Sequence, residues 1–324
     1  MNRTRLYRDG KCVDEDFDPA KISDHLAEKG NVIWLDIDQP KAKDFQLIAE
    51  EFELNPLAVE DALGERQRPK LDHYDDHLFI TLYDSQLDMK TGELTTRELS
   101  LFVGKSYLIT VHKDPGYSMD AVVKRWNDNT QLCHHDVGFL LWGVLDVVID
   151  GYFDAVQSLD DEIESLEDLL FNTGRRSNEV QRRTFELRKS LVAIRRYVLP
   201  TREILNTLMR REDGLVDAAM MPYYQDVYDH VLRAADSIDA LRDLVSTILE
   251  THLTIQGNQM NQVMKQVTSW AAIAAVPTII TGYYGMNVRI FPGADTLSGG
   301  ISALVLMVVL VSVLYAAFRR RDWL

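Results

Sequence analysis

The fold of this chain is decided by residues 263–284, VMKQVTSWAAIAAVPTIITGYY, together with the Gly285-Met286-Asn287 that follows them. The stretch contains no acidic residue and a single base, Lys265, near its start. This composition is typical of a helix that crosses about 30 Å of hydrocarbon. A second stretch, residues 301–318, carries no charge and precedes Arg319-Arg320-Arg321. We therefore predict two transmembrane helices, in preference to a buried helical hairpin in a soluble core.

The two predicted spans are joined by a short loop, so they form a hairpin and both chain ends lie on one side of the membrane. Clusters of Lys and Arg favour the cytoplasmic flank of a span. The terminal arginines therefore predict a multi-pass protein of the plasma (inner) membrane with both termini cytoplasmic. No apolar run follows Met1, so no cleavable signal is expected.

Composition limits what the rest of the chain can be. The 324 residues leave room for a large soluble part ahead of the first span. A net charge of -15 disfavours nucleic-acid binding, which needs an excess of Lys and Arg, and is compatible with cations as ligands. Cys12 and Cys133 have neither the spacing of a disulfide framework nor that of a zinc site, which fits a reducing cytosol.

Residues 1–130 are predicted to form a cytosolic α/β domain. Helix signals lie between Asp18-Pro19 and Gly30, after Pro40, and at Asn55-Pro56. Strand signals lie at residues 32–35, 77–87, 93–103 and 107–112. Because the last three strands follow one another across short turns, the expected sheet contains an antiparallel meander.

Residues 131–262 are predicted to form a long helical hairpin and a stalk helix. The hairpin consists of residues 134–171 and 177–211, with a break at Asn172-Thr173-Gly174. Pro222 begins the stalk, whose apolar residues recur at spacings of three and four and continue into the first span. A helix over residues 222–284 would be roughly 90 Å long at about 1.5 Å per residue. Such a helix cannot bury its apolar stripe alone, so we expect an oligomer in which copies enclose a central axis.

Two polar clusters each have two interpretations. The entrance of the first span carries the amides Gln256, Asn258, Gln259, Asn261, Gln262 and Gln266. These amides either replace water around a passing cation or form an ordinary helix boundary. The tip of the helical hairpin carries the acids Asp160, Asp161, Glu162, Glu164, Glu167 and Asp168. These acids either concentrate divalent cations or form a solvated face.

Gly104-Lys105-Ser106 resembles the end of a phosphate-binding P-loop. That motif requires a glycine five positions before Gly104, where Leu99 stands, and it opens a helix rather than joining two strands. We therefore interpret the tripeptide as a hairpin turn.

Gly285-Met286-Asn287, placed after the first of two carboxy-terminal spans, resembles the CorA-type magnesium channels, whose hallmark is this tripeptide. Further matching stretches cover nearly the whole chain: Ala58-Val59-Glu60-Asp61, Gln67-Arg68-Pro69-Lys70-Leu71, Leu101-Phe102-Val103-Gly104-Lys105, Pro222-Tyr223-Tyr224, Asp226-Val227-Tyr228-Asp229-His230, Asn261, Val263-Met264-Lys265 and Trp323-Leu324. The resemblance implies an α+β membrane protein whose cytosolic parts precede a two-helix transmembrane pore domain at residues 263–324. It also implies assembly as a homopentameric funnel.

The resemblance further implies which residues meet the ion. Gly285, Met286 and Asn287 would form the selectivity filter. The pore-lining residues would be Asn261, Met264, Val267, Ala271, Ala275, Thr278 and Gly282. This chain is one residue shorter than many relatives between Pro277 and Gly285 and has one extra residue before Pro277. The register near Val267 and Thr268 therefore stays open.

A regulatory metal site is implied in the same way. In this family, divalent ions bound between neighbouring cytosolic domains hold the channel closed, and Asp226 matches an acid used for that purpose. Asp84 or Asp88, near the end of the predicted strand 77–87, are candidate partners. His230, one helical turn beyond Asp226, is a further candidate ligand. The alternative is that each is a solvated surface residue.

The two predicted spans contain neither an acid nor a histidine, and this composition indicates how the protein transports an ion. Proton-coupled carriers usually place ionisable groups inside the membrane, and no ATP-binding motif is present. We therefore predict a channel for Mg²⁺ influx, with Co²⁺ and Ni²⁺ as further candidates, driven by the membrane potential and gated by cytosolic Mg²⁺. Mg²⁺ keeps several waters, which suits the amide oxygens of Asn287. Met286 is expected to pack rather than ligate, because sulfur suits softer metals.

Three alternatives stay open. One is a zinc transporter of the same superfamily, resembling ZntB, and another is a non-conducting, membrane-anchored metal sensor. The third is an enzyme, but we find no nucleophile, general base or metal constellation of recognisable spacing, so neither catalysis nor an organic cofactor is expected. The adjacent His134 and His135 do not share a helical face, which disfavours a metal pair there.

Overall fold

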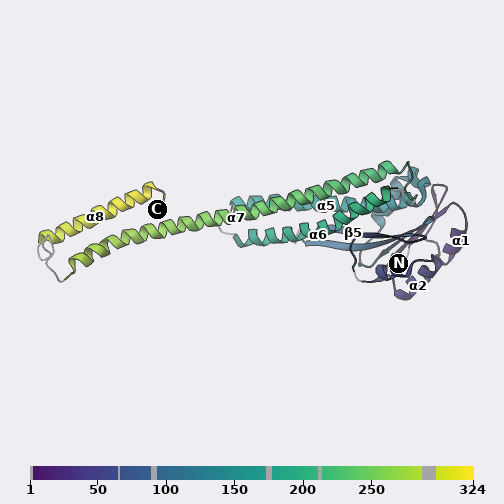
Figure 1. Cartoon of the computed structure of the whole chain (residues 1–324), viewed down its shortest axis with the longest axis horizontal. Helices are drawn as coiled ribbons and strands as arrows, with labels where there is room; N and C mark the ends of the chain where they lie inside the picture. Colours follow the sequence, from purple (N-terminus) through teal and green to yellow (C-terminus); the bar gives the residue numbers. More distant parts are fainter. Residues whose placement is uncertain (1–2, 65, 89–92, 173–176, 211–213, 287–296) are drawn as a thin grey trace. The chain divides into compact units, whose positions relative to one another are not determined.

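The computed structural model describes residues 3–64, 66–88, 93–172, 177–210, 214–286 and 297–324 (Figure 1). The chain forms two compact units, Met1–Ile248 and Leu249–Leu324. One helix, α7 (Met221–Tyr284), contributes residues to both. The predicted functional division at residues 1–130, 131–262 and 263–324 stays a prediction.

A seven-stranded sheet organises the first unit, in the order β2-β1-β3-β7-β6-β5-β4. The strands are β1 (Arg3–Arg8), β2 (Lys11–Glu15), β3 (Asn31–Asp38), β4 (Lys70–His73), β5 (Leu78–Asp88), β6 (Glu93–Val103) and β7 (Tyr107–His112). Neighbours are antiparallel except for β3 and β7, which are parallel. The predicted meander of residues 77–112 is therefore confirmed. Gly104 lies in the turn between β6 and β7, where its amide donates to the Tyr107 carbonyl at 2.9 Å, as expected for a hairpin turn.

Short helices cover one face of this sheet. These are the 3-10 helix η1 (Pro19–Lys21), α1 (Ile22–Ala27), α2 (Ala42–Glu51) and α3 (Pro56–Leu63). Alternate residues of β3, namely Ile33, Leu35 and Ile37, join one hydrophobic cluster with Phe45 of α2 and Ala58 of α3. Because side chains alternate across a strand, Trp34 and Asp36 point to the other face.

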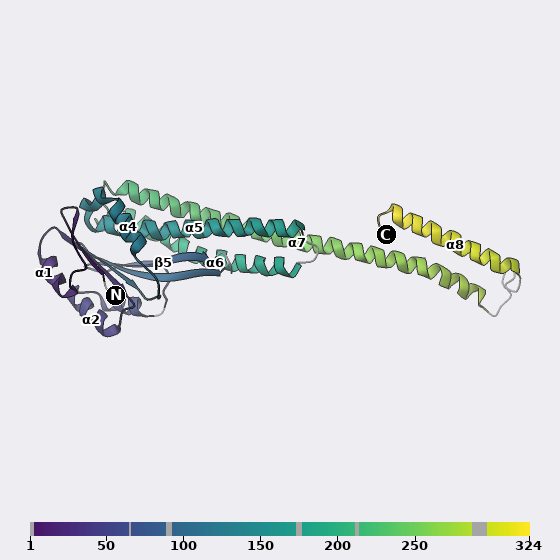
Figure 2. The same cartoon turned by 180° about the vertical axis from the view of Figure 1, so that it is seen from behind.

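The short helix α4 (Asp120–Asp128) and the long helices α5 (Asp136–Asn172) and α6 (Ser177–Met209) cover that other face, as Figures 1 and 2 show from two sides. Trp34 meets Trp126 of α4 edge to face, with ring centroids 4.9 Å apart. The Trp126 indole donates to the Leu140 carbonyl of α5 at 3.1 Å, after the 3-10 helix η2 (Thr130–His135). The two predicted hairpin helices are present, and α5 packs directly on the sheet.

The second unit contains the end of α7 and the helix α8 (Leu297–Arg320), which lie side by side in both views (Figures 1 and 2). Within the described residues, three helices are long and apolar enough to span a membrane: the region Thr130–Leu170, α7 and α8. The apolar window of the first is 78% buried within the chain, whereas those of α7 and α8 are 6% and 0% buried. The first is therefore a core helix, and the two predicted spans match the other two.

Candidate functional site

The apolar part of α7 has two different faces. Ser269 and Ile280 are buried, with 0% and 8% of their surface exposed, and Ile273, Val276 and Tyr284 are partly covered. These residues recur every three or four positions, so they form one stripe. Since α8 is the neighbouring element in this unit (Figure 1), the stripe marks the α8-facing side.

The residues predicted to line a pore lie on the opposite side of α7. Ala271, Ala275, Thr278 and Gly282 are all exposed, and each stands two positions from a residue of the α8-facing stripe. Two residues correspond to about 200° of rotation at roughly 3.6 residues per turn. Met264 and Val267 are also exposed, by 58% and 62%, and so is Asn261. One chain alone thus leaves this face uncovered.

The same geometry bears on the open register near Val267. Val267 stands two positions before the buried Ser269, which places it opposite α8. Thr268 is adjacent to Ser269, about 100° away, but it is exposed as well. The register near these two residues therefore stays open.

The last turn of α7 leads to the predicted filter. Pro277 lies inside the helix, and the Thr281 hydroxyl donates to the Pro277 carbonyl at 2.8 Å. The Gly285 amide donates to the Thr281 carbonyl at 2.9 Å, and Met286 is 55% exposed. Asn287, the central residue of the predicted filter, lies outside the described residues.

The predicted regulatory acid Asp84 stands on β5 and is largely buried, with 16% of its side chain exposed. Arg97 lies directly opposite on β6, and its Nη1 is 3.6 Å from Asp84 Oδ2. Burial raises the pKa of the Asp84 carboxyl, and the charge of Arg97 opposes that rise. Asp88 is the last residue of β5, and its side chain lies outside the described residues.

Asp226 and His230 come together on the first part of α7. His230 Nε2 is 3.9 Å from Asp226 Oδ1, and its Nδ1 is 3.9 Å from Asp150 Oδ1 of α5. The Asp226 side chain is 69% exposed and so is available to a partner. No hydrogen bond or ion pair found among the described side chains joins Asp84 to Asp226.

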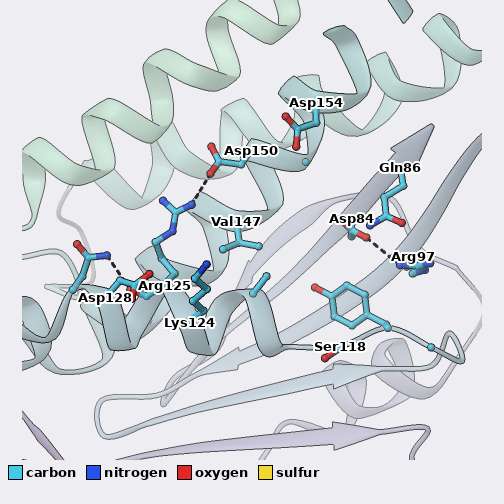
Figure 3. A pocket seen from close by; sticks show the side chains of 15 residues that line it. Asp84, Gln86, Arg97, Ser118, Lys124, Arg125, Asp128, Val147, Asp150 and Asp154 are labelled. Carbon is cyan, nitrogen blue, oxygen red and sulfur yellow. Dashed lines mark hydrogen bonds and ion pairs between the residues drawn. The ribbon is translucent and has the colours of Figure 1, made fainter. Parts of the chain in front are cut away.

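A cavity of about 780 Å³ is lined by Asp84 and Asp150, but not by Asp226 or His230, and it contains both signs of charge (Figure 3). Arg97 and Asp84 pair on the strands, while Arg125 of α4 donates to Asp150 of α5 at 2.7 Å. Lys124, Asp128 and Asp154 also line the cavity. Over the parts of the chain with described side chains, no group of three His, Cys, Asp or Glu residues could hold a metal ion.

Of the charged residues in and beside this cavity, sequence reasoning named only Asp84 and missed, among others, Arg97, Arg125, Asp146 and Asp150. Asp146 accepts a hydrogen bond from Arg125 and is only 6% exposed. Burial raises the pKa of Asp146 to about 6, Arg125 opposes this, and Asp150 adds to it. The sequence pattern could have identified two of these residues, because Asp146 and Asp150 are acids four residues apart within an otherwise apolar stretch.

Known proteins are similar to this chain in sequence and in fold. A sequence model of the family described as "CorA-like Mg2+ transporter protein" matches residues 29–320. The chain is 32% identical over 280 residues to the cobalt/magnesium transport protein CorA of Thermotoga maritima, covering 86% of this chain and 79% of the relative. The complete structure of the CorA magnesium transporter from Methanocaldococcus jannaschii matches with a TM-score of 0.82 at 25% identity, covering 100% and 99% of the two chains. The ZntB cytoplasmic domain from Vibrio parahaemolyticus matches with 0.51 at 17% identity over 70% and 88%, which concerns the fold alone.

Proposed function

This chain belongs to the CorA-like Mg²⁺ transporter family, and we propose that it carries Mg²⁺ into the cell as a homopentameric channel of the plasma membrane. The observation that carries this proposal is the uncovered stripe of α7, opposite the side that faces α8. The stripe is uncharged and exposed in one chain, as expected of a helix that surrounds an aqueous path together with further copies. Co²⁺, named together with magnesium for the relative from Thermotoga maritima, is the second candidate ion.

The proposed path follows the stripe from the amides at its start to the end of α7. Asn261, Met264 and Val267 lie first, followed by Ala271, Ala275, Thr278 and Gly282. Neutral side chains hold a divalent ion weakly, so the ion can leave again. Gly285, Met286 and Asn287 would form the filter, in which amide and carbonyl oxygens bind a Mg²⁺ that keeps most of its waters. Met286 contributes packing, since its sulfur is a poor ligand for Mg²⁺.

The driving force is the membrane potential, with both termini in the cytoplasm. At about 2.3 kcal/mol per charge per 100 mV, a divalent ion gains about 4.6 kcal/mol on entry. At about 1.4 kcal/mol per tenfold ratio, this corresponds to more than about three decades of concentration. An ungated pore would therefore overload the cell with the ion, which gives a physical reason for regulation.

The proposed gate uses the acids of the first unit. Cytosolic Mg²⁺ would bind between neighbouring subunits through Asp226 and one of Asp84 or Asp88, with His230 assisting. The exposure of Asp226 supports this, because a neighbouring subunit can reach an exposed carboxylate. Bound cations would hold the subunits together in the closed state, and their loss at low Mg²⁺ would release them.

The filter assignment is tested with purified protein in vesicles that hold a Mg²⁺-sensitive dye. We expect Asn287→Ala to abolish Mg²⁺ uptake while leaving assembly unchanged. Asn178→Ala is the control, because Asn178 is an exposed amide of α6 that lies outside the proposed path. Normal Mg²⁺ flux through Asn287→Ala would refute the filter assignment. Uptake of Zn²⁺ in preference to Mg²⁺ would instead support the zinc alternative, and no uptake of either ion would support a sensor.

A further inference from the structure

The end of α8 concentrates positive charge where a membrane-spanning helix leaves the hydrocarbon. Arg319, Arg320 and Arg321 are consecutive, and all three are exposed. Successive helical residues are rotated by about 100°, so the three side chains spread around the helix end. Among the residues that the structure describes, no hydrogen bond or ion pair is recorded for their guanidinium groups. The three charges are therefore available to a ligand from outside the chain.

A turn at the end of α8 places an aromatic pair beside these arginines. Asp322 has a left-handed backbone with a φ of 54°, and the Trp323 amide donates to the Phe318 carbonyl at 3.0 Å. Such a turn is common at helix ends, and it folds the chain back onto the last helical turn. The Trp323 ring consequently stacks on Phe318, with ring centroids 5.7 Å apart. Because tryptophan favours the membrane–water interface, this pair holds the arginines at the level of the lipid headgroups.

The helix α7 adds a fourth base at the same end of the second unit. The last turn of α8 lies beside the early part of the α7 span (Figures 1 and 2). Lys265 is exposed and stands four residues before the buried Ser269, so it lies on the side of α7 that faces α8. Trp270 is nearby and is 58% exposed. In the sequence of residues 251–286 and 297–324, Asp322 is the only acid, so this end is strongly cationic.

The uncovered side of α8 suits the acyl chains of a lipid. Val309 and Val313 are 50% and 58% exposed, and they stand eleven and seven residues before Arg320. These spacings return to nearly the same side of a helix, so the apolar stripe leads directly to Arg320. Phe318 stands two residues before Arg320, or about 200° away, and is partly covered. One ligand with apolar chains and an anionic head would contact both the valines and the arginine.

We propose that Lys265, Arg319, Arg320 and Arg321 form a binding site for the headgroup of an anionic phospholipid. Guanidinium groups bind phosphate oxygens through paired hydrogen bonds, and the net charge of the site attracts a lipid that carries a negative charge. A zwitterionic lipid has the same phosphate but also a cation, which these bases repel. A free phosphate lacks the chains that the exposed valine stripe would contact.

The test measures lipid binding to the full-length protein in mixed micelles, using brominated lipids that quench tryptophan fluorescence on contact. Trp270 and Trp323 report on the site, because the other three tryptophans are buried in the first unit: Trp34, Trp126 and Trp142. We expect phosphatidylglycerol to bind at least about tenfold more tightly than phosphatidylcholine, since each base near the membrane surface contributes about fivefold. This preference should weaken as salt screens the charges. Equal binding of the two lipids, or a preference that ignores salt, would refute the site.

Variants locate the preference at the end of α8. Arg320→Gln alone should reduce the preference for phosphatidylglycerol about fivefold, and replacing all three arginines by glutamine should remove most of it. Replacement by lysine keeps the charge and should keep most of the preference. The unfolding temperature of each variant shows that it is folded. The matched control removes three exposed bases of α6 instead: Arg182→Gln, Arg188→Gln and Lys189→Gln. An equal loss in this control would contradict the proposal, because overall charge would then explain the binding.

Inorganic phosphate distinguishes a lipid site from a phosphate site. We expect phosphate to displace phosphatidylglycerol no better than chloride at the same ionic strength. If phosphate displaces the lipid at concentrations that chloride does not match, the site recognises free phosphate and the proposal fails. The result does not depend on ion transport, so a missing lipid preference refutes this inference even where Mg²⁺ uptake is normal.

Discussion

Single residues of the first unit carry the proposed control of transport, and Asp226 is the most exposed of those whose side chains are described. It lies on α7 beside His230, with 69% of its side chain accessible. A substitution there disturbs little packing within one chain. It does change the charge presented to a neighbouring subunit.

We predict that Asp226→Lys keeps conducting at internal Mg²⁺ concentrations that stop the wild type. A lysine at this position repels the cation that the carboxylate attracts, so the closed state loses its ligand. Vesicle uptake at high internal Mg²⁺ measures the effect, with Asp236→Lys, another exposed acid of α7, as the control. Inhibition at the wild-type concentration would remove Asp226 from the gate.

Asp146 gives a pH dependence of stability with a definite sign. Burial raises its pKa to about 6 from the ordinary 3.8, so the folded protein binds more protons than the unfolded chain between these values. The Asp146 carboxyl therefore contributes most to the free energy of unfolding below about pH 4. This contribution falls as pH rises toward 6 and does not change further above about pH 6. At about 1.4 kcal/mol per pKa unit, the full change in the free energy of unfolding is about 3 kcal/mol.

We predict that unfolding temperatures measured from pH 4 to pH 7 reveal this change as a difference between the wild type and Asp146→Asn. The wild type should lose stability relative to the variant as pH rises to about 6, because only the wild type ionises a buried carboxyl. Parallel curves would contradict the assignment. A relative gain by the wild type would mean that Arg125 stabilises the charged form enough to lower the pKa.

At the scale of elements, the second unit depends on how α7 meets α8. Ser269 has no exposed surface, and its hydroxyl donates to the Lys265 carbonyl at 2.8 Å. A small side chain at this position allows two helices to approach closely, as is common between transmembrane helices. Because Ser269 lies on the side of α7 that faces α8, the stripe on the opposite side of α7 faces away from α8.

We predict that Ser269→Leu lowers the stability of the assembled protein by about 1–3 kcal/mol, because the added carbons overpack the contact. Gln266→Leu makes a similar change at an exposed position of the same helix and should have a smaller effect. Thermal unfolding in detergent measures both variants. Equal stability of the two would show that Ser269 does not face a packed neighbour.

Long periodic elements and short helices that begin at a proline were predictable from the sequence, whereas β1, β2, β4 and α4 were not. The helices α5, α6 and α7 and the strands β5, β6 and β7 have regular apolar patterns over six residues or more. The strand β2 was missed because all five of its residues are exposed, so it shows no alternation. The strand β4 has only four residues, and α4 only nine. Their positions depend on tertiary contacts, such as that between Trp126 and Trp34.

Candidate site residues could be named from the sequence only where a motif or the family resemblance marked them. Asp84, Asp226 and the stripe of α7 were named in this way, and their roles stay predictions. Arg97 was not, because its position comes from strand register, which pairs it with Asp84 across a turn. The closeness of Gly151 to Asp84 depends on how α5 lies on the sheet, which the local sequence does not record.

At the scale of the whole molecule, the proposed function requires several copies of α7 around one ion path. We predict that native mass spectrometry of the purified protein in detergent gives the mass of a homopentamer of the 37.1 kDa chain. The stripe that one chain leaves uncovered supports this, since copies arranged about an axis would shield it from lipid. A monomer or dimer that still transports Mg²⁺ would contradict the arrangement.

The central claim is that Mg²⁺ flows passively along its potential and is stopped by Mg²⁺ inside. The most direct test sets the potential of vesicles that contain the protein and records Mg²⁺ entry while internal Mg²⁺ is raised. We expect Mg²⁺ entry to increase as the vesicle interior becomes more negative, to be unchanged by a proton gradient, and to cease as internal Mg²⁺ rises. Entry that follows the proton gradient and ignores both the potential and internal Mg²⁺ would contradict it.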